Sequence, residues 1–504
     1  MTARALFPHK KLKPHGAFAP RGFWKRMMTM KKQVFNPYLP VDEFIPDGEP
    51  YVFDGRVYIF GSHDRCDGRD YCLDDYVCWS APVDDPSDWR YEGVIFRRDQ
   101  DPKNPDGSRL LQAPDVSKGP DGRYYLYYVL TVPKWSDLEI AVAVSDTPAG
   151  QYEYLGVVHF KDGRKLDTPL PFDPAVLLDD DGRVYLYFGF APHFPMRGQP
   201  IPETLGAFCV ELEADMLTCK GEPVNIMPDF KHAGGTEYEA HPFFEAASIR
   251  KIDGTYYFVY CSHLMHELCY ATSKYPDRDF KFGGTIVSNA DVGYQGRTAE
   301  HARNQIANIH GGMVKLNSQW YIFYHRHTHG KQFSRQGCAE PITIDENGAI
   351  DQVECTSFGL SGGKAPAREP IPAWCACNLY KGQGGEFIKF GPVAQVEAPY
   401  VVVKDEGYVT NITDTGVVGF RYLTFDGTER TLSLRVRGVC SGTLNVYLED
   451  EDRNAAGTAP LVLTNAEEWS WITLPVTVQA GDRPLRLRYT GEGMFELAQL
   501  RIRD

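Results

Sequence analysis

Five segments of the sequence repeat one pattern, a two-residue polar turn followed by a run in which β-branched and aromatic residues alternate. An Asp-Gly turn before such a run is a strong local signal for a β-hairpin. The repeats are spaced more widely than the roughly 40–50 residues of a typical propeller blade, which suits four-stranded blades with long loops. The copies are DGRVYIFGS at 54–62, DGRYYLYYV at 121–129, DGRVYLYFG at 181–189, DGTYYFVYC at 253–261 and NSQWYIFYH at 317–325. We therefore expect an all-β chain with a five-bladed β-propeller over residues 34–360, the alternative being a sandwich or solenoid with similar hairpins.

The charge balance limits the ligands that such a chain can bind. The sequence carries 53 Lys and Arg against 67 Asp and Glu, a formal net charge of -14 at pH 7. This balance excludes the broad basic face that nucleic acid or an anionic membrane surface requires. No apolar run is long enough to cross a bilayer. A neutral or cationic small ligand is the better match, and the oligomeric state is left open.

The N-terminus and the cysteines bear on the cellular compartment. Residues 1–33 are basic, contain Pro and Gly, and lack a continuous apolar stretch. We expect a disordered extension there and no signal peptide. The 12 Cys residues are scattered and lack zinc-ligand spacing, so free thiols are the simpler interpretation. Together these features predict a cytoplasmic protein.

A polar residue stands at the start of the strand that leads into each predicted hairpin. The innermost strands of a propeller surround its central channel, so equivalent positions in five blades converge near one end of the axis. Four carboxyl groups and one imidazole are therefore expected to meet there. They belong to Asp47, Asp115, Asp173, Glu245 and His310.

Converging carboxyl groups are suited to glycoside hydrolysis. One protonated carboxyl donates a proton to the leaving oxygen, a second takes a proton from water, and a third raises the pKa of the acid by repulsion. Aromatic side chains suit the faces of a sugar ring, and the candidates are Trp79, Trp89, Trp135 and Phe243. The alternatives are that each Asp only caps a loop and that each aromatic residue belongs to the core.

The succession PDGEP, APDV, FDP followed by DDDG, FEAASIRK, HGG and YHRHT resembles glycoside hydrolase family 43 over residues 36 to about 358. The resemblance implies a five-bladed propeller with an inverting mechanism. It implies that Asp47 is the general base, Glu245 the general acid, and Asp173 the acid that tunes and orients Glu245. It further places Asp115 and His310 in support of the site and Arg335 at the sugar hydroxyls. Calcium near His310 and a simple hydrogen bond from its ring are equal alternatives there.

The resemblance implies an exo-acting enzyme that releases terminal α-L-arabinofuranose or β-D-xylose from short plant hemicellulose oligosaccharides, with arabinose narrowly preferred. The chemistry requires no cofactor, and the only partner expected is the oligosaccharide. The alternatives are a β-xylosidase or an arabinanase only, a phosphorylase, and a sugar-binding propeller without catalysis. A phosphorylase needs cationic residues to hold phosphate, and no Arg/Lys pair stands beside the ring of acids.

The C-terminal part has a different pattern. Residues 361–387 carry Gly and Pro at linker density, and residues 388–504 contain short alternating runs typical of a β-sandwich. The run GYVTNITDTGVVGFRYLTF and the later WSWITLPV resemble family 6 carbohydrate-binding modules. Tyr422 and one of Trp469 and Trp471 could form a sugar cleft, but we expect these side chains to pack in the core or between the domains.

Overall fold

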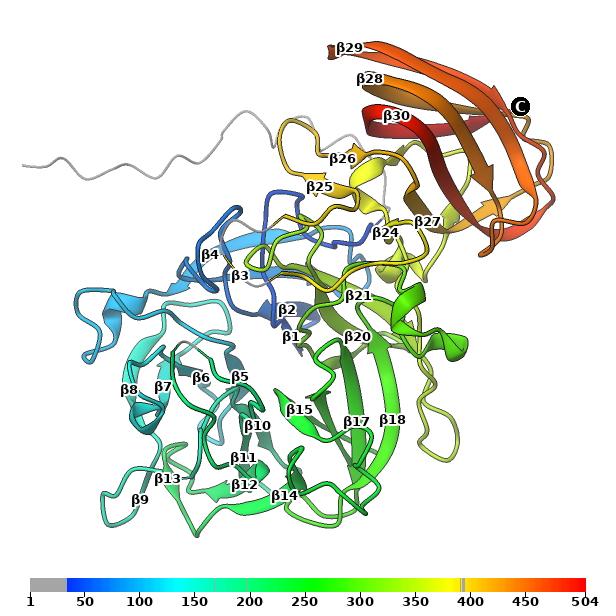
Figure 1. Cartoon of the computed structure of the whole chain (residues 1–504). Helices are drawn as coiled ribbons and strands as arrows, with labels where there is room; N and C mark the ends of the chain where they lie inside the picture. Colours follow the sequence, from blue (N-terminus) through cyan, green and yellow to red (C-terminus); the bar gives the residue numbers. More distant parts are fainter. Residues whose placement is uncertain (1–33, 167, 197, 390, 392–394) are drawn as a thin grey trace, which may run out of the picture.

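The computed structural model describes residues 34–166, 168–196, 198–389, 391 and 395–504 (Figure 1). The predicted N-terminal extension, residues 1–33, lies outside the described residues. Each of the five predicted hairpins is present and joins the first two strands of an antiparallel sheet. In the first copy Phe53 pairs with Arg56, and Asp54 and Gly55 both have positive φ, 49° and 78°. That conformation gives a turn whose twist matches the flanking strands.

The five sheets are the blades of the propeller, as predicted. Blade 1 contains β1 (Glu49–Phe53), β2 (Arg56–Phe60), β3 (Tyr76–Pro82) and β4 (Arg90–Phe96). Blade 2 contains β5 (Asp115–Lys118), β6 (Tyr124–Val129), β7 (Ile140–Ser145) and β8 (Glu153–Val157). Blade 3 contains β10 (Ala175–Leu178), β11 (Val184–Phe188), β12 (Gly206–Leu212) and β14 (Val224–Pro228), with β9 (His159–Phe160) and β13 (Thr218–Cys219) added at its edge. Blade 4 contains β15 (Phe243–Ile252), β16 (Thr255–Ser262), β17 (Glu267–Ser273) and β18 (Lys281–Ser288), and blade 5 contains β19 (Met313–Leu316), β20 (Gln319–Arg326) and β21 (Gln336–Ile342).

The second strand of each blade is buried on both faces. All six residues of β6 and all five of β11 are buried, and both sequences are continuous runs of aliphatic and aromatic residues. Blades pack face to face, so both faces of a central strand are removed from water and aromatic residues fill both. The described helical segments are short 3₁₀ turns, namely η1 (Arg98–Gln100), η2 (Trp135–Asp137), η3 (Tyr294–Gly296), η4 (Ala299–His301), η5 (Gly359–Ser361) and η6 (Ala373–Cys375). Among the described residues, no helix is long and apolar enough to cross a membrane.

The ring is closed by the segment that precedes blade 1. Asn36 is fully buried beside β21, where its side-chain amide donates to Ala339 O at 2.9 Å and its Oδ1 accepts the Ala339 N–H at 3.0 Å. The same amide nitrogen donates to Glu340 Oε1 at 2.9 Å and to Thr356 O at 3.0 Å. One side chain thus takes the place of a strand partner for the three-stranded blade 5.

Residues 361–387, expected to be a linker, instead supply three short strands to the C-terminal sheet. Ile371 and Leu379 are 0% and 1% exposed and pack in its core with Val418 and Leu500, so burial of apolar side chains outweighs the local Gly and Pro content. Pro366 and Pro372 end the short strands β22 and β23, and Gly362, Gly363 and Gly382 have positive φ outside the strands. The strands of the sheet are β22 (Ala365–Pro366), β23 (Ile371–Pro372), β24 (Asn378–Lys381), β25 (Tyr400–Val402), β26 (Tyr408–Ile412), β27 (Gly416–Phe425), β28 (Thr431–Tyr447), β29 (Ala455–Pro475) and β30 (Gly481–Arg503).

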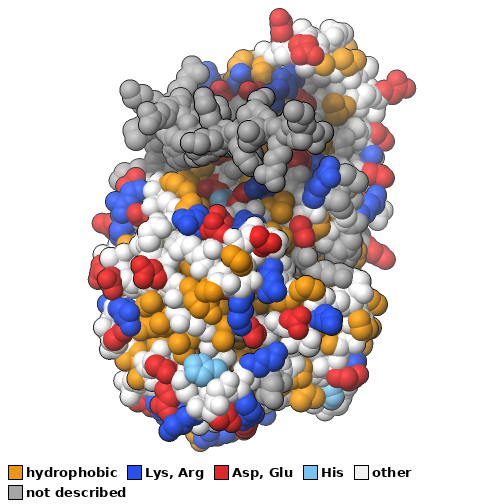
Figure 2. All heavy atoms as spheres, turned by 90° about the vertical axis from the view of Figure 1, so that its left-hand side faces the viewer, with side chains coloured by type: hydrophobic (Ala, Val, Ile, Leu, Met, Phe, Trp, Pro, Cys, Tyr) orange, Lys and Arg blue, Asp and Glu red, His pale blue; other side chains and the backbone are white. Residues whose placement is uncertain are grey.

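The C-terminal sheet is joined to the propeller by a buried ion network. Arg421 of β27 is fully buried and donates to Asp291 Oδ2 at 3.2 Å, to Asp450 Oδ1 at 2.7 Å and to Glu354. The Tyr422 hydroxyl also donates a hydrogen bond to Glu354, so Tyr422 packs between the domains. Strands β28–β30 extend away from the propeller (Figure 1). On the face drawn in Figure 2, acidic and basic side chains are intermixed over the blades.

Candidate active site

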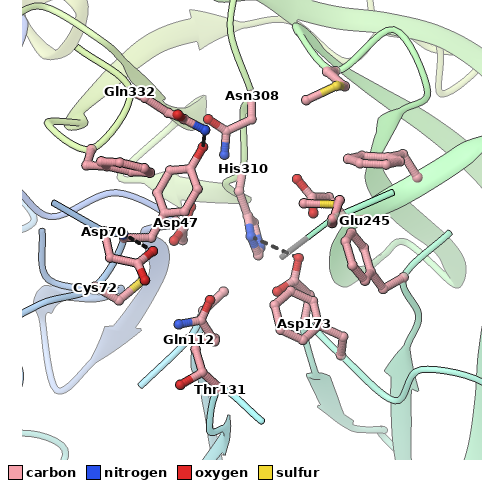
Figure 3. Close-up of a pocket in the computed structure, with 18 of the residues that line it drawn as sticks. Asp47, Asp70, Cys72, Gln112, Thr131, Asp173, Glu245, Asn308, His310 and Gln332 are labelled. Carbon is pink, nitrogen blue, oxygen red and sulfur yellow. Dashed lines mark hydrogen bonds and ion pairs between the residues drawn. The ribbon is translucent and has the colours of Figure 1, made fainter. Parts of the chain in front are cut away.

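A cavity of about 550 Å³ lies where the first strands of the blades begin. Asp47, Asp173, Glu245, His310 and Arg335 all line it, so the structure brings together the three proposed catalytic acids with the predicted histidine and arginine. Figure 3 shows the three acids and His310 entering from different blades, with His310 between Asp47 and Glu245 in that view. The three acids and His310 converge because each stands ahead of, or at the start of, a first strand, whereas Arg335 directly precedes β21, the third strand of blade 5.

Asp47 is held by two hydrogen bonds, one to its side chain and one from its main chain. It precedes β1 with φ at 56°, a left-handed conformation that Asp tolerates better than most residues. Its Oδ1 accepts a hydrogen bond from Arg335 Nη1 at 2.8 Å, and its N–H donates to His325 Nδ1 at 3.2 Å. His325 Nε2 then donates to Asn308 O at 3.0 Å. Burial holds the pKa of His325 well below its usual range, so the ring is neutral and its Nδ1 is an acceptor.

Arg335 joins Asp47 to a second carboxylate. Its Nε and Nη2 donate to the two oxygens of Asp64 at 2.8 and 3.0 Å, which is a bidentate pair. The guanidinium also stacks on the Tyr71 ring at 4.6 Å. Because the guanidinium is planar and two of its nitrogens are bound to Asp64, the third nitrogen, Nη1, points at Asp47. Arg335 therefore positions the proposed base.

Glu245 is on β15, where the register with β16 is irregular on both sides of the residue. This bulge turns the carboxyl into the cavity. Burial, and then the negative charge of Asp47, raises its pKa to about 8, with Arg335 acting in the opposite direction. Glu245 is therefore protonated at neutral pH, as a general acid must be.

Asp173 precedes β10 and accepts the N–H of Ala246 on its Oδ2 at 2.9 Å. Ala246 follows Glu245 directly and has φ at 67°, so this bond fixes the backbone next to the acid. Burial, and then the charges of Glu245 and Asp47, holds the pKa of Asp173 well above its usual range. The same Oδ2 lies 3.6 Å from His310 Nδ1.

His310 lines the cavity as a neutral imidazole, because burial lowers its pKa to about 4. Two groups of described residues bring three ligand-type atoms close together, Cys66–Asp67–His329 and His241–Glu267–Cys269. His310 belongs to neither group. Calcium prefers six to eight oxygen ligands, so an ion beside this ring would need oxygens in addition to the nearby Asp173 carboxyl.

Asp115 and Phe243 do not line the cavity. Asp115 is fully buried, accepts the N–H of Val176 at 2.6 Å, and so links blade 2 to blade 3. Phe243 is fully buried and stacks on Phe258, whereas its neighbour Phe244 lines the cavity. Phe244 therefore faces the cavity, whereas Phe243, the predicted sugar contact, points into the blade.

The remaining wall of the cavity is mostly apolar. Of the predicted platforms Trp135 lines it, whereas Trp79 donates to Glu43 Oε2 at 2.9 Å and Trp89 packs against Tyr38. Aromatic and thioether side chains cluster there, which suits the apolar faces of a sugar. They are Trp135, Phe172, Phe190, Phe194, Met196 and Phe244.

Several residues of the site were not found from the sequence. Asp64 orients the proposed base through Arg335, and Tyr71 and Gln332 form part of the wall. Gln332 donates to the Tyr71 hydroxyl at 2.8 Å. These residues precede no hairpin, so the repeat that revealed the carboxyl groups gave no signal for them.

The comparisons with known proteins agree with this geometry. Residues 44–350 match glycosyl hydrolases family 43. A xylosidase/arabinosidase of Thermoclostridium stercorarium is 47% identical over 482 residues, which is 93% of this chain and 98% of that protein. A xylosidase/arabinosidase of Bacteroides ovatus is 29% identical over 345 residues, covering 63% of this chain and 97% of that protein. A family 43 β-xylosidase/α-arabinofuranosidase from a compost microbial metagenome, solved with xylotriose in a calcium-free form, shares 27% identity at a TM-score of 0.51 and covers 64% of this chain and 98% of its own. The chain therefore belongs to glycosyl hydrolases family 43 and is a glycoside hydrolase.

Proposed function

We propose that this hydrolase is an inverting exo-glycosidase that releases terminal α-L-arabinofuranose and β-D-xylose from hemicellulose oligosaccharides. The observation that carries the proposal is the cavity with three carboxyl groups, one of which has its pKa raised to about 8 while another is ion-paired with an arginine. The xylosidase/arabinosidase name of the relative that is 47% identical supports the choice of pentoses. Arabinose is placed narrowly first.

In the proposed reaction Glu245 gives its proton to the leaving glycosidic oxygen as the bond from that oxygen to the anomeric carbon breaks. Asp47 takes a proton from a water molecule, whose oxygen forms the new bond on the opposite face of the sugar. The two carboxyl groups must then lie roughly 6.5–9.5 Å apart so that the water fits between base and sugar. Asp173 keeps the acid in place through Ala246, and Arg335 keeps the base in place through Asp64.

The proposed steps use the carboxyl groups and require no cofactor. His310 Nδ1 lies 3.6 Å from Asp173 Oδ2, and the ring is proposed either as a neutral partner of that acid or as a ligand of calcium near the propeller axis. The partner of the protein in this proposal is the oligosaccharide alone. A cytoplasmic location is supported by twelve cysteines that form no disulfide among the described residues.

The C-terminal strands are proposed to form a β-sandwich similar to family 6 carbohydrate-binding modules, with packing against the propeller as their main role. The interdomain bonds of Arg421 and Tyr422 support this role. Trp469 packs on Tyr408, and Trp471 is covered on one side by Arg501.

Hydrolysis of 4-nitrophenyl α-L-arabinofuranoside and 4-nitrophenyl β-D-xyloside tests the proposal. We expect the parent to cleave at least one of them and Asp47→Asn to lower kcat by about 10²–10⁴-fold, because the general base is lost while the shape of the side chain is kept. Asp54→Asn is the matched control, since Asp54 is an exposed turn residue at a conformation that Asn also adopts. A folded parent that cleaves neither substrate, or an Asp47→Asn variant with parental kcat, would overturn the proposal. Proton NMR of the first product anomer tests inversion.

A further inference from the structure

Blade 4 holds three side chains of metal-binding type away from the catalytic cavity. His241 precedes β15, and Glu267 and Cys269 are alternate residues of β17. Alternate side chains of a strand point to one face, so the carboxylate and the thiol lie side by side. One ligand-type atom from each of the three residues lies within 4.8 Å of the other two. We call this set the blade 4 cluster; the spacing of the cysteines did not reveal it because His241 is distant from the other two in the sequence.

The distances within the blade 4 cluster are close to those of a tetrahedral zinc site. His241 Nδ1 lies 2.6 Å from Glu267 Oε1 and 3.9 Å from Cys269 Sγ. Zinc binds nitrogen and oxygen at about 2.0–2.2 Å and sulfur at about 2.3 Å, which places neighbouring tetrahedral ligand atoms about 3.3–3.7 Å apart. The nitrogen and the carboxylate oxygen would therefore move apart by less than about 1 Å to admit an ion.

The carboxylate of Glu267 is already oriented by its neighbours. Ser262 Oγ donates to Glu267 Oε1 at 2.6 Å, and Thr285 Oγ1 donates to Oε2 at 3.0 Å. Burial raises the pKa of Glu267, but the hydrogen bond and the charge of His241 outweigh burial and lower the pKa to about 2. The group is thus ionised, and hydroxyl partners of this kind fix the direction of a metal-binding carboxylate.

The other group of ligand-type atoms, on Cys66, Asp67 and His329, is less suited to a metal ion. Lys331 Nζ donates to the same Asp67 Oδ1 that lies 3.1 Å from His329 Nε2, so an ammonium group already neutralises that carboxylate. In the part of the chain that the structure describes, no Lys or Arg forms an ion pair with the blade 4 cluster. A divalent cation would therefore meet no competing positive side chain there.

We propose that the blade 4 cluster binds a zinc ion through His241 Nδ1, Glu267 and Cys269, with a water molecule in the fourth position. A set of imidazole, carboxylate and thiolate ligands suits zinc. When the ion binds, the thiol proton and the proton between His241 and Glu267 pass to solvent. The His241 side chain is 27% exposed, which leaves the ion a path of entry. The ion would tie the segment just before Glu245 to β17 and stabilise blade 4, a role separate from the proposed hydrolysis.

Cobalt(II) is the probe for this site, because it replaces zinc and its bond to a thiolate gives an intense near-ultraviolet charge-transfer band. The full chain, without an affinity tag, is first freed of metal with a chelator. We expect an equimolar amount of cobalt to produce the band and zinc to abolish it. Zinc should also raise the midpoint of thermal unfolding by several degrees, since a ligand that binds only the folded state stabilises it. Cys269→Ser should lose both the band and the shift.

Cys209→Ser is the matched control, because Cys209 is a thiol on β12 that is only 1% exposed and belongs to neither group. It should keep the band and the shift. His241→Phe preserves stacking on Phe282 but removes a ligand without touching the buried thiol, and it should weaken zinc binding by about tenfold or more. A parent without the band, or a band that persists in Cys269→Ser and disappears in Cys66→Ser, would overturn the site. Glycosidase activity is not the readout, so these outcomes leave the proposed function untouched.

Discussion

Glu245 shows how one residue receives its role from its surroundings. Its pKa rises to about 8 because the carboxyl is buried and lies near the charge of Asp47. A surface glutamate would be ionised at neutral pH and could donate no proton. The bulge of β15 and the bond from Ala246 to Asp173 hold the group in this position.

The pH dependence of the enzyme follows from this shift. The acid must carry its proton, so kcat/KM of the parent should fall as pH rises through about 8. In Asp47→Asn the repelling charge is removed, so the pKa of Glu245 falls and the alkaline limb of the residual activity should move to lower pH. Initial rates measured between pH 5 and pH 10 give the alkaline limb of the parent and that of Asp47→Asn. An alkaline limb that stays in place in Asp47→Asn would show that the charge of Asp47 does not act on the acid.

The sequence predicted the proposed catalytic residues better than the residues that hold them. The repeat located Asp47, Asp173 and Glu245 because each occupies the same position in its blade. It could not separate Phe243 from Phe244, since the bulge at Glu245 alters which face each presents. Partners such as Asp64 come from long loops, whose path depends on tertiary contacts and leaves no periodic pattern.

Among the elements, blade 5 depends on a segment from the other end of the chain. It has three strands, and its outer edge is covered by the residues around Asn36. The Asn36 side chain forms hydrogen bonds with both the N–H and the C=O of Ala339 on β21. Without Asn36 these main-chain groups would be unpaired at the edge of the sheet. It also contacts Glu340, a buried carboxyl whose pKa is raised to about 8 by burial.

Asn36→Ala should therefore destabilise the propeller by a few kcal/mol, because several buried polar groups lose their partner at about 1–3 kcal/mol each. Asn445→Ala is the control, since Asn445 accepts one exposed hydrogen bond from Thr458 and should change stability by about 0.5 kcal/mol or less. Thermal unfolding followed by intrinsic fluorescence measures the difference. Equal midpoints for the two variants would contradict the role given to Asn36.

The five hairpins were predictable because an Asp-Gly turn and an alternating run are local signals. The segment 361–387 was not, because its Gly and Pro residues are common to linkers and to tight turns between short strands. Its membership of the C-terminal sheet is decided by Ile371 and Leu379, which pair with strands far along the chain. The pairing of two strands so far apart in the sequence cannot be inferred from the residues of one of them alone.

At the scale of the whole molecule, the two domains are joined by charge as well as by apolar contact. Arg421 faces three carboxylates, of which Asp291 and Glu354 come from the propeller side and Asp450 from the loop after β28. Removal of a buried arginine leaves the carboxylates that it paired with buried and without a counter-charge, which costs several kcal/mol. The propeller and the C-terminal sheet should therefore unfold as one unit.

Arg421→Met should cost about 3–5 kcal/mol and separate the single thermal transition into two, because three carboxylates lose their counter-charge in a buried interface. Arg435→Met provides the comparison, since Arg435 pairs with the exposed Glu406 at 3.3 Å and lies over the Trp469 ring, and among the described residues it forms no bond to the propeller carboxylates. Differential scanning calorimetry resolves the transitions, and limited proteolysis between the domains reports their separation. A single unshifted transition in Arg421→Met would show that the network does not couple the domains.

The contact of Asn36 with Ala339 and Thr356 also sets an order of events during biosynthesis. These partners lie 303 and 320 residues after Asn36, so Asn36 leaves the ribosome long before blade 5, which it covers, has been made. Until the fifth blade has been translated, the nascent ring is an open arc with an uncovered edge at each end. A nascent-chain chaperone that shields strand edges therefore has most to protect in this protein just before the C-terminal sheet is made.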